Sequence, residues 1–315
     1  MKKTLLFFFM LAALCMQARN REVHLRLIAT SDIHGNYLPF DYISRQPGRG
    51  GLSRVETYVR TQREELGREQ VVVLDNGDIL QGQPTAYYYN FIDTTSTHFC
   101  AQALNYIGYD AATIGNHDIE TGHAVYDRWV GECNFPMLGA NVVSTSTGRP
   151  YWKPYTIIER NGIRIGVLGM ITPSIPKWLP NNLWSGLRFD DLVETARRWL
   201  PEMRYKEHAD IIVGLLHSGI GSHNARGRMF ENAALQVARM VPGFDIIFCG
   251  HDHREADLRI ANVRGDSVLV LNPAANGMSV AQADIHLTLK RKAIVGKRVS
   301  GRLVNVADLQ PDSDF

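Results

Sequence analysis

Cysteine, net charge and long apolar runs are all scarce in this sequence of 315 residues. Its four cysteines form no Cys-x-x-Cys pair, so neither a zinc ribbon nor a thiol nucleophile is indicated. Lysine and arginine number 34 against 32 acidic residues, a balance that argues against nucleic-acid binding driven by bulk charge. The main apolar run, residues 5–16, is shorter than the about 20 residues that span a membrane. We therefore expect no transmembrane segment and no nucleic-acid polymer as a partner.

The composition that is present is that of a soluble globular protein. Hydrophobic residues make up 45% and charged residues 21% of the chain, which argues against disorder, collagen-like repeats and a coiled coil. A chain of this length suits one large domain or two small ones, and folding buries about 75% of its surface. Because the sequence has no internal repeat, low-complexity tract or break in composition, we expect a single domain.

The first residues have the layout of a secretory signal peptide. Two lysines precede the apolar run, and cleavage after Ala18 would remove residues 1–18. The protein is therefore expected to be exported, to a periplasm or to the cell surface. A lipid anchor on Cys15 is the alternative, but Leu14 is larger than the small residue that normally precedes a lipidated cysteine.

Short apolar runs alternate with amphipathic stretches along the rest of the chain. Candidate strands cover residues 24–29, 71–74, 112–114, 163–168, 211–216, 245–249, 267–271 and 280–289. Candidate helices cover residues 52–65, 96–107, 190–205 and 231–240. Strands separated by helices of this length indicate an α/β architecture, and the last strands, which have no helices between them, indicate a mixed sheet.

Polar residues that can bind metals follow five of these strands, where open α/β sheets usually place their sites. They are Asp32 and His34, Asp78, Asn116 with His117 and Asp118, His217, and His251 with His253. Each piece alone is better explained as an ordinary turn, a helix cap or a hydrogen-bonded histidine. Two imidazoles at i and i+2 do project alike from an extended backbone. Five such strand ends in one chain favour a metal site over the separate structural explanations.

The types of ligand indicate which ions would bind. A mixture of imidazole, carboxylate and amide groups suits divalent zinc, manganese, cobalt or iron. A carboxylate shared by two ions would hold them about 3.5–4 Å apart, as in two-metal phosphoryl-transfer sites. Asp78 is our candidate for that bridge. The amide of Asn116 is an uncommon ligand, and it stands next to His117.

Taken together, these motifs resemble the signature of the calcineurin-like metallophosphoesterases. The motifs are Thr30-Ser31-Asp32-Ile33-His34-Gly35, Asn76-Gly77-Asp78, Gly115-Asn116-His117-Asp118, Leu216-His217-Ser218-Gly219 and Gly250-His251-Asp252-His253. Within that superfamily the chain is similar to the catalytic domain of bacterial 5′-nucleotidases. The stretch 75–84, and the segment 194–204 that leads to His217, look like the branch with 2′,3′-cyclic-nucleotide 2′-phosphodiesterase and 3′-nucleotidase activity. The resemblance covers about residues 24–290.

The resemblance implies a fold and a role for each residue. The fold would be a four-layer αββα sandwich with mixed sheets. One metal would be held by Asp32, His34, Asp78 and His253, and the other by Asp78, Asn116, His217 and His251. His117 would stabilise the phosphoryl charge or protonate the leaving oxygen. Glu120 stands where the family has an aspartate paired with that histidine, and one helical turn would place the two on the same face. Asp118 replaces a glutamate of the family and is expected to be structural, for example as a helix cap.

The expected domain organisation raises a question about the substrate. We expect a catalytic domain over residues 19–303 and a loose acidic tail over 304–315, without the nucleotide-binding domain that follows in the resembled family. A partner chain could supply that domain, the catalytic domain could act alone on simpler phosphoesters, or the function could have changed. The choice among 2′,3′-cyclic, 3′- and 5′-nucleotides rests on the resemblance. A metal-binding regulatory module with little activity is the alternative from another functional class.

Two further sets of residues keep alternatives open. Trp178, Trp184 and Tyr87 to Tyr89 could stack a nucleobase, although packing in the core or on the surface is the more usual role of such rings. Cys100 and Cys133 could form a bridge in an oxidising compartment. Cys249 follows an apolar run and is expected to be a buried thiol.

Overall fold

Two six-stranded sheets form the centre of the molecule in the computed structural model, which describes residues 20–222 and 227–315. In spatial order the first sheet consists of β16 (Ala293–Asn305), β15 (Ser279–Lys290), β1 (Arg21–Thr30), β4 (Val71–Asp75), β5 (Ala111–Thr113) and β6 (Met137–Leu138). The second consists of β13 (Glu255–Ala261), β14 (Ser267–Pro273), β12 (Ile246–Cys249), β11 (Ile211–His217), β9 (Ile163–Ile171) and β8 (Tyr155–Arg160). Each sheet combines parallel and antiparallel pairs, so the predicted mixed α/β architecture is confirmed.

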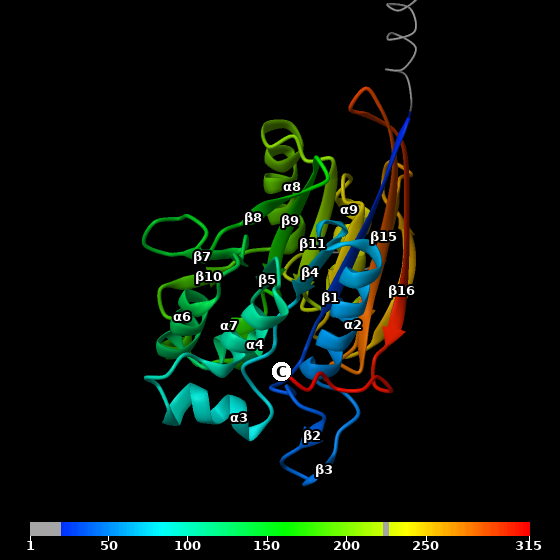
Figure 1. Cartoon of the computed structure of the whole chain (residues 1–315). Coiled ribbons are helices and arrows are strands. Elements are labelled where there is room, and N and C mark those ends of the chain that lie inside the picture. The colour runs from blue at the N-terminus through cyan, green and yellow to red at the C-terminus, as the bar shows by residue number, and fades with distance from the viewer. Residues whose placement is uncertain (1–19, 223–226) are drawn as a thin grey trace, which may run out of the picture.

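Helices pack on the outer face of each sheet (Figure 1). The first sheet carries α2 (Leu52–Leu66), α4 (Phe99–Ile107) and α6 (His123–Glu132), and the second carries α8 (Leu192–Pro201) and α9 (Ala234–Met240). The shorter helical elements are α3 (Pro84–Tyr87), α5 (Asn116–Ile119), α7 (Ile175–Trp178), the 3₁₀ turns η1 (Arg68–Gln70) and η3 (Asn181–Leu183), and the π turns η2 (Tyr88–Ile92) and η4 (Glu202–Lys206). Strands β2 (Phe40–Asp41) and β3 (Gln46–Pro47) form one small sheet, and β7 (Val142–Ser144) and β10 (Leu187–Phe189) form another.

Alternation along β1 explains how the layers stack. Leu25 and Leu27 point into a buried cluster that also contains Val213 of β11, so this cluster is the core between the two sheets. Ile28 points to the other face and packs in the cluster that contains Leu52 of α2. A third cluster joins β9 and β11 to α8 and α9. The order helix, sheet, sheet, helix is therefore the four-layer sandwich predicted from the family resemblance.

Each strand predicted from an apolar run has a counterpart, and the missed strands lie at sheet edges. Strands β8, β13 and β16 are partly exposed along their length, so they carry no continuous apolar run for a sequence pattern to detect. The predicted helix over 190–205 is present as α8 followed by the π turn η4, and α6 was not predicted.

The segment after β16 is packed against α2, so the expectation of a loose acidic tail is wrong. The Arg54 Nε–H donates to the carbonyl of Leu309 at 3.0 Å, and the backbone N–H of Asp312 donates to the carbonyl of Ser53 at 2.9 Å. The carboxylate of Asp312 is buried and pairs with Arg60. Local acidity suggested a solvated segment, but basic and polar groups on α2 offer partners for it. The predicted signal peptide lies outside the described residues.

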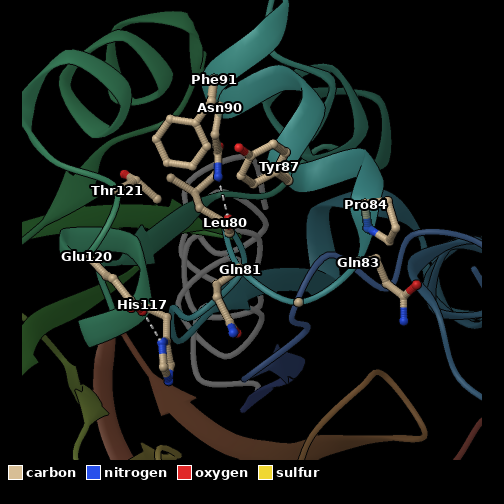
Figure 2. A pocket seen from close by; sticks show the side chains of 11 residues that line it. Leu80, Gln81, Gln83, Pro84, Tyr87, Asn90, Phe91, His117, Glu120 and Thr121 are labelled. Atoms are coloured by element: carbon tan, nitrogen blue, oxygen red, sulfur yellow. Dashed lines mark hydrogen bonds and ion pairs between the residues drawn. The ribbon is translucent and has the colours of Figure 1, made fainter. Parts of the chain in front are cut away.

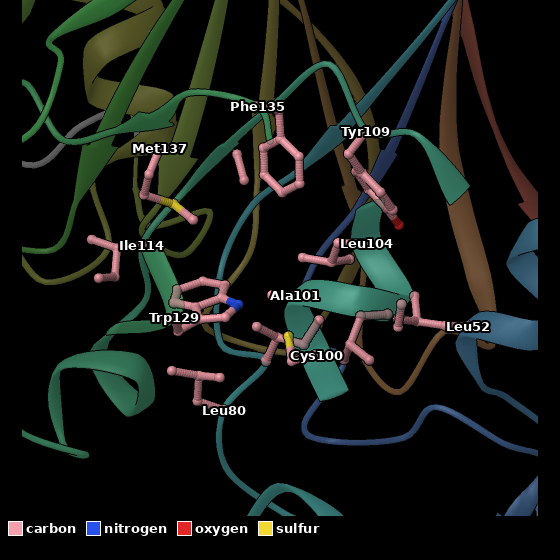
Figure 3. Packing of buried hydrophobic residues seen from close by; sticks show 14 of the residues in the cluster. Leu52, Leu80, Cys100, Ala101, Leu104, Tyr109, Ile114, Trp129, Phe135 and Met137 are labelled. Carbon is pink, nitrogen blue, oxygen red and sulfur yellow. The ribbon is translucent and has the colours of Figure 1, made fainter. Parts of the chain in front are cut away.

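The three cysteines of the described residues are free thiols, so a Cys100–Cys133 bridge is not formed. Cys100 is the second residue of α4 and lies among buried apolar side chains, where Figure 3 shows it near Leu104 and Trp129. Cys249 is buried, as predicted. Among the described helices, none has both the length and the apolar character that crossing a membrane requires.

Candidate metal centre

All seven predicted ligands lie at the carboxyl ends of the central strands of the two sheets. Asp32 and His34 follow β1, Asp78 follows β4, and Asn116 opens α5 after β5. The second sheet supplies His217 as the last residue of β11, and His251 and His253 follow β12. Carboxyl ends of parallel strands meet at one edge of a sheet, so residues far apart in sequence come together. The sandwich then brings the two sheet edges together.

Asp32, His34 and His253 form one candidate group, which we call the open group. The Nε2 atoms of the two imidazoles face each other at 2.9 Å, and the Nε2 of His253 lies 3.3 Å from an oxygen of Asp32. The carboxylate of Asp32 is fully buried, whereas the side chain of His253 is 48% exposed. The open group thus combines a buried carboxylate, that of Asp32, with a solvent-exposed imidazole, that of His253.

Asp78, His217 and His251 form the second group, which we call the buried group. The Nε2 of His217 lies 3.1 Å from an oxygen of Asp78 and 3.1 Å from the amide oxygen of Asn116. The side chains of His217 and Asp78 are 0% and 1% exposed. Asn116, which the resemblance assigned to this metal, therefore lies within reach of the same point.

The backbone is strained where it presents these side chains. Asp32, His34, Asp78, His251 and His253 all have positive φ, between 51° and 74°. Residues other than glycine rarely adopt this left-handed conformation, which costs on the order of 1–3 kcal/mol each. Five such residues at one site are best explained by a requirement of the site, since unconstrained turns would use glycine.

Two glycines allow the strand ends to approach closely. A Cβ at Gly250 would lie 1.9 Å from the Ser31 hydroxyl and 2.5 Å from a carboxylate oxygen of Asp32. A Cβ at Gly115 would lie 2.1 Å from a carboxylate oxygen of Asp78. Any larger residue would displace the carboxylates, so both glycines are needed for the geometry of the site.

Asp118 organises the loop that carries Asp78. Its carboxylate accepts hydrogen bonds from the backbone N–H groups of Asp78, Ile79 and Leu80 at 2.9 Å and from that of Gly115 at 2.7 Å. Burial raises the pKa of Asp118 to about 6, and the nearby charge of Asp78 adds to the rise, while the backbone donors oppose it. These contacts agree with the structural role predicted for Asp118.

His117 and Glu120 lie beside the two groups. The Nδ1 of His117 is 2.6 Å from a carboxylate oxygen of Glu120, and its backbone N–H donates to Asp78 at 2.8 Å. The imidazole of His117 lies near that of His34, with 5.4 Å between the ring centroids. The longer glutamate arm thus reaches the histidine as the helical spacing predicts. The catalytic role of this pair remains a prediction.

The donor atoms fit two divalent cations. His217 Nδ1 lies 2.7 Å from the backbone carbonyl of Asn76, which can only accept, so Nδ1 carries a proton. Its Nε2 is then directed at oxygens of Asp78 and Asn116 that also act as acceptors. Such a cluster needs a positive charge at its centre, either a proton or a cation. In the open group, two imidazole nitrogens, the Nε2 atoms of His34 and His253, face each other in a comparable way.

Electrostatic interactions among these side chains also indicate a site that suits cations. Burial opposes the charged form of His217, but the carboxylate of Asp78 outweighs it and raises its pKa to about 10. Burial also opposes the ionised form of Asp78, but His217 holds the pKa of Asp78 well below its usual range. Burial lowers the pKa of both His34 and His251, which favours the neutral, metal-binding form of these rings.

Three residues that are not among the predicted site residues support the candidate ligands. The side-chain oxygen of Gln81 lies 3.0 Å from Nδ1 of His34, and a carboxylate oxygen of Glu231 lies 3.1 Å from Nε2 of His251. The backbone carbonyl of Asn76 orients His217. Partners of this kind fix ring orientation. Gln81 and Asn76 lie in the stretch 75–84 that carried the resemblance, but no sequence signal marks Glu231.

Two cavities meet at His117 and Glu120. One, of about 570 Å³, is lined by Tyr87 and Phe91 among others, and Figure 2 shows both rings on the wall across from His117 and Glu120. The other, of about 380 Å³, contains Asn116, Trp178 and His251. The ring of Trp178 stacks on that of His251, with 5.5 Å between centroids.

Two of the other aromatic candidates, Trp184 and Tyr89, pack within the fold. The Nε1–H of Trp184 donates to the carbonyl of Leu179 at 3.0 Å, and its ring meets that of Phe189. Tyr89 packs against His98 and Phe99. These two rings therefore have the packing role that is more usual for aromatic side chains.

A model of the calcineurin-like phosphoesterase family matches residues 25–255, which include every residue of both groups. The chain belongs to this family. The two groups therefore stand as the potential dimetal centre of a calcineurin-like phosphoesterase.

Relatives within the family are named as enzymes of nucleotide hydrolysis. The chain is 32% identical over 306 residues to the trifunctional nucleotide phosphoesterase protein YfkN of Bacillus subtilis, a match that covers 92% of this chain and 20% of that protein. It is 34% identical over 248 residues to a 2′,3′-cyclic-nucleotide 2′-phosphodiesterase/3′-nucleotidase of Yersinia enterocolitica, covering 75% of this chain and 37% of the relative. The chain thus spans less than half the length of these relatives.

Solved structures share the fold. A calcineurin-like phosphoesterase YfkN structure from Bacillus subtilis superposes with a TM-score of 0.80 at 30% identity, covering 91% of this chain and 92% of that one. A putative 5′-nucleotidase from Staphylococcus aureus superposes with a TM-score of 0.77 at 26% identity, covering 93% of this chain and 55% of that one.

Proposed function

We propose that this chain hydrolyses phosphoesters of nucleotides at a centre of two divalent cations. The observation that carries the proposal is the pairing of the open and buried groups where the edges of the two sheets adjoin, with His117 beside both. The names of the relatives support nucleotides as the substrate class. Either 2′,3′-cyclic and 3′-nucleotides or 5′-nucleotides fit these names.

The open group, with Asp78, would hold one cation, and the buried group, with Asn116, would hold the other. Zinc, manganese, cobalt and iron all suit this set of imidazole, carboxylate and amide ligands. When bound, two such cations neutralise the charge of a phosphoryl group and lower the pKa of water near it. The remaining chemistry falls to side chains of the chain itself.

His117 is placed to supply a proton to the leaving oxygen. An ionised Glu120 only accepts hydrogen bonds, so the contact at 2.6 Å keeps a proton on Nδ1 and fixes the plane of the ring. The other nitrogen, Nε2, then holds the proton that moves to the leaving group when the imidazole is charged. A general acid of this kind contributes a factor of about 100 to 10,000.

A substrate panel with defined metals tests the proposal. Metal-free protein is reconstituted with manganese, zinc, cobalt or iron and assayed with adenosine 2′,3′-cyclic, 3′- and 5′-phosphates and with glycerol 2-phosphate. We expect bound metal near two ions per chain and turnover of at least one nucleotide. Asp308→Asn, which changes a highly exposed carboxylate, should behave as wild type. Protein that binds metal but hydrolyses none of these substrates would contradict the proposal and favour a regulatory module.

Two expectations from the sequence remain proposals alongside this one. Export rests on the layout of residues 1–18, and appearance of the protein outside the cytoplasm with a cleaved N-terminus would support it. A contribution of a separate chain to recognition of the nucleotide rests on the family resemblance. It requires nucleotide turnover to rise when a separately expressed nucleotide-binding domain is added, and no rise with any such domain would contradict it.

A further inference from the structure

The cavity lined by Tyr87 and Phe91 has a chemical character unlike that of the metal centre. It contains no residue of the open or buried group, yet His117 and Glu120 form part of its wall. Figure 2 shows the two rings reaching into this cavity from the α3–η2 segment, with His117 on the far side. Apolar ring faces and polar amide and hydroxyl groups therefore surround one space next to the predicted proton donor.

The two rings lie on one side of the helical segment because they are four residues apart. Their centroids are 5.1 Å from each other, and the ring planes are tilted by 57°. Tyr87 is 60% exposed and Phe91 is 47% exposed, so neither ring is used to fill the core. Tyr88, which is 47% exposed, lies on the same segment but does not line the cavity.

Buried hydrogen bonds hold this wall in place relative to the metal centre. The amide of Asn90, at 3% exposure, donates to the carbonyl of Leu80 at 2.6 Å and accepts from Nε2 of His98 at 2.9 Å. Leu80 follows Asp78 by two residues in the loop that Asp118 organises. These hydrogen bonds connect the π turn η2 to the loop that carries Asp78. They thereby fix the position of Tyr87 and Phe91 relative to the metal centre.

We propose that this cavity binds the nucleoside part of the substrate, with the base against Tyr87 and Phe91. This inference rests on the proposed function and adds the location of the leaving group. A proton donor must reach the leaving oxygen, so the leaving group lies on the His117 side of the centre. The cavity on the other side of His117 contains Asn116 and His251, and it suits the phosphoryl end. The ring of Trp178 already stacks on that of His251, so we do not assign it to the base.

The volume and chemistry of the cavity agree with this occupant. About 570 Å³ lies within the range of about 300–1,000 Å³ of small-molecule sites. Aromatic faces bind any base by stacking, which is a sequence-tolerant interaction. Gln81 and Thr121 place polar atoms near the same space, as the hydroxyl and amino groups of a nucleoside require.

The test compares a nucleotide with a small aliphatic phosphoester. Tyr87→Ala/Phe91→Ala is assayed on the adenosine monophosphate that wild type hydrolyses best and on glycerol 2-phosphate, with Tyr88→Ala as the matched control. We expect kcat/KM for the nucleotide to fall by about 5- to 100-fold, mainly through KM, because base stacking on aromatic rings has this magnitude. Glycerol 2-phosphate should change less than about twofold, Tyr88→Ala should match wild type, and Tyr87→Phe should retain nucleotide turnover.

Equal losses on both substrates would overturn the inference, since they would show that the rings support the centre instead of binding the base. Unchanged nucleotide turnover would overturn it as well. A calorimetric titration of adenosine into wild type and the double variant provides a readout that does not depend on turnover. Wild type should bind adenosine and the double variant should bind it at least about fivefold more weakly.

The titration also separates this inference from the proposed function. Wild type that binds adenosine but hydrolyses no phosphoester would contradict the proposed function and leave the binding site standing. Wild type that hydrolyses glycerol 2-phosphate but does not bind adenosine would contradict the binding site and leave phosphoester hydrolysis standing.

Discussion

The open and buried groups use the same chemistry at different depths. Each has one carboxylate and two imidazoles, and each takes ligands from both sheets. In the buried group His217 is fully buried and oriented by a backbone carbonyl, that of Asn76. In the open group His253 is half-exposed, and His34 is oriented by the side chain of Gln81.

The difference in depth implies that the two groups differ in how far they are organised before a cation binds. A main-chain partner cannot change rotamer, so His217 and the Asp78 carboxylate beside it are organised before any cation binds. The open group depends on side chains that solvent can reach, so its cation should exchange more readily. The buried group should therefore bind its cation more tightly than the open group, and chelation should remove the open-group cation first. Four experiments test this contrast between the two groups.

The largest effect is expected from Asp78→Asn, because Asp78 is the carboxylate assigned to both cations. The amide removes the negative charge while its oxygen can still accept the N–H of His117. Activity should fall by at least about 10,000-fold, since phosphoryl charge stabilisation by cations is worth several kcal/mol. Metal content should fall below one ion per chain, measured by elemental analysis beside Asp308→Asn. Retention of two ions would show that Asp78 does not join the groups.

His117→Ala should lower kcat by about 100- to 10,000-fold and leave both cations bound. The reason is that His117 lies outside both groups yet contacts them through its backbone N–H, which alanine keeps. Glu120→Gln should lower kcat less, because it retains a side chain that can accept from Nδ1. Steady-state kinetics with metal analysis gives the result. Full turnover of His117→Ala would show that the proton comes from elsewhere.

His217→Ala and His253→Ala compare the two depths directly in metal-free protein. Loss of His217 leaves the buried carboxylate of Asp78 without its imidazole, which should lower the free energy of unfolding by about 3–5 kcal/mol. Loss of the half-exposed His253 should cost about 1 kcal/mol or less. Urea denaturation at pH 7 measures both. Similar losses would mean that depth does not distinguish the groups.

The smallest effect at pH 7 concerns His98, which supports the loop of the buried group through Asn90. Burial lowers the pKa of His98 to about 4, and the charge of Arg128 adds to this. A histidine with a pKa of about 6.5 when unfolded takes up a proton on unfolding, so stability is full above pH 6.5 and is lost as the pH falls towards 4. The loss should reach about 3 kcal/mol near pH 4.

His98→Asn is the matched variant for this pH dependence. Asparagine is a good N-cap and can accept the N–H of Cys100, as His98 now does at 3.2 Å, but it does not titrate. Urea denaturation between pH 4 and 7 should show a shallower loss of stability in the variant. An identical slope would assign the acid sensitivity to other groups.

Prediction from the sequence was strongest where one local pattern carried the information. The apolar run in Val71–Asp75 and the polar Asp78 just after it predicted both a buried strand and a candidate ligand. Edge strands such as β16 were harder to predict from the sequence, because their half-exposed residues form no apolar run. The ordered course of residues 306–315 was missed because its partners, such as Arg54, lie some 250 positions away.

The type of fold, the candidate ligands and the kind of ion they suit could be predicted from the sequence, because these depend on short-range patterns and on side-chain chemistry. The tertiary structure was needed to show that the candidate ligands form a buried and an open group, and that Glu231 and Gln81 orient two of the histidines. It also decided that Tyr87 and Phe91 face a cavity beside His117 while Trp184 packs in the fold. Depth, orientation and shared cavities depend on which distant segments meet, and no local pattern contains that information.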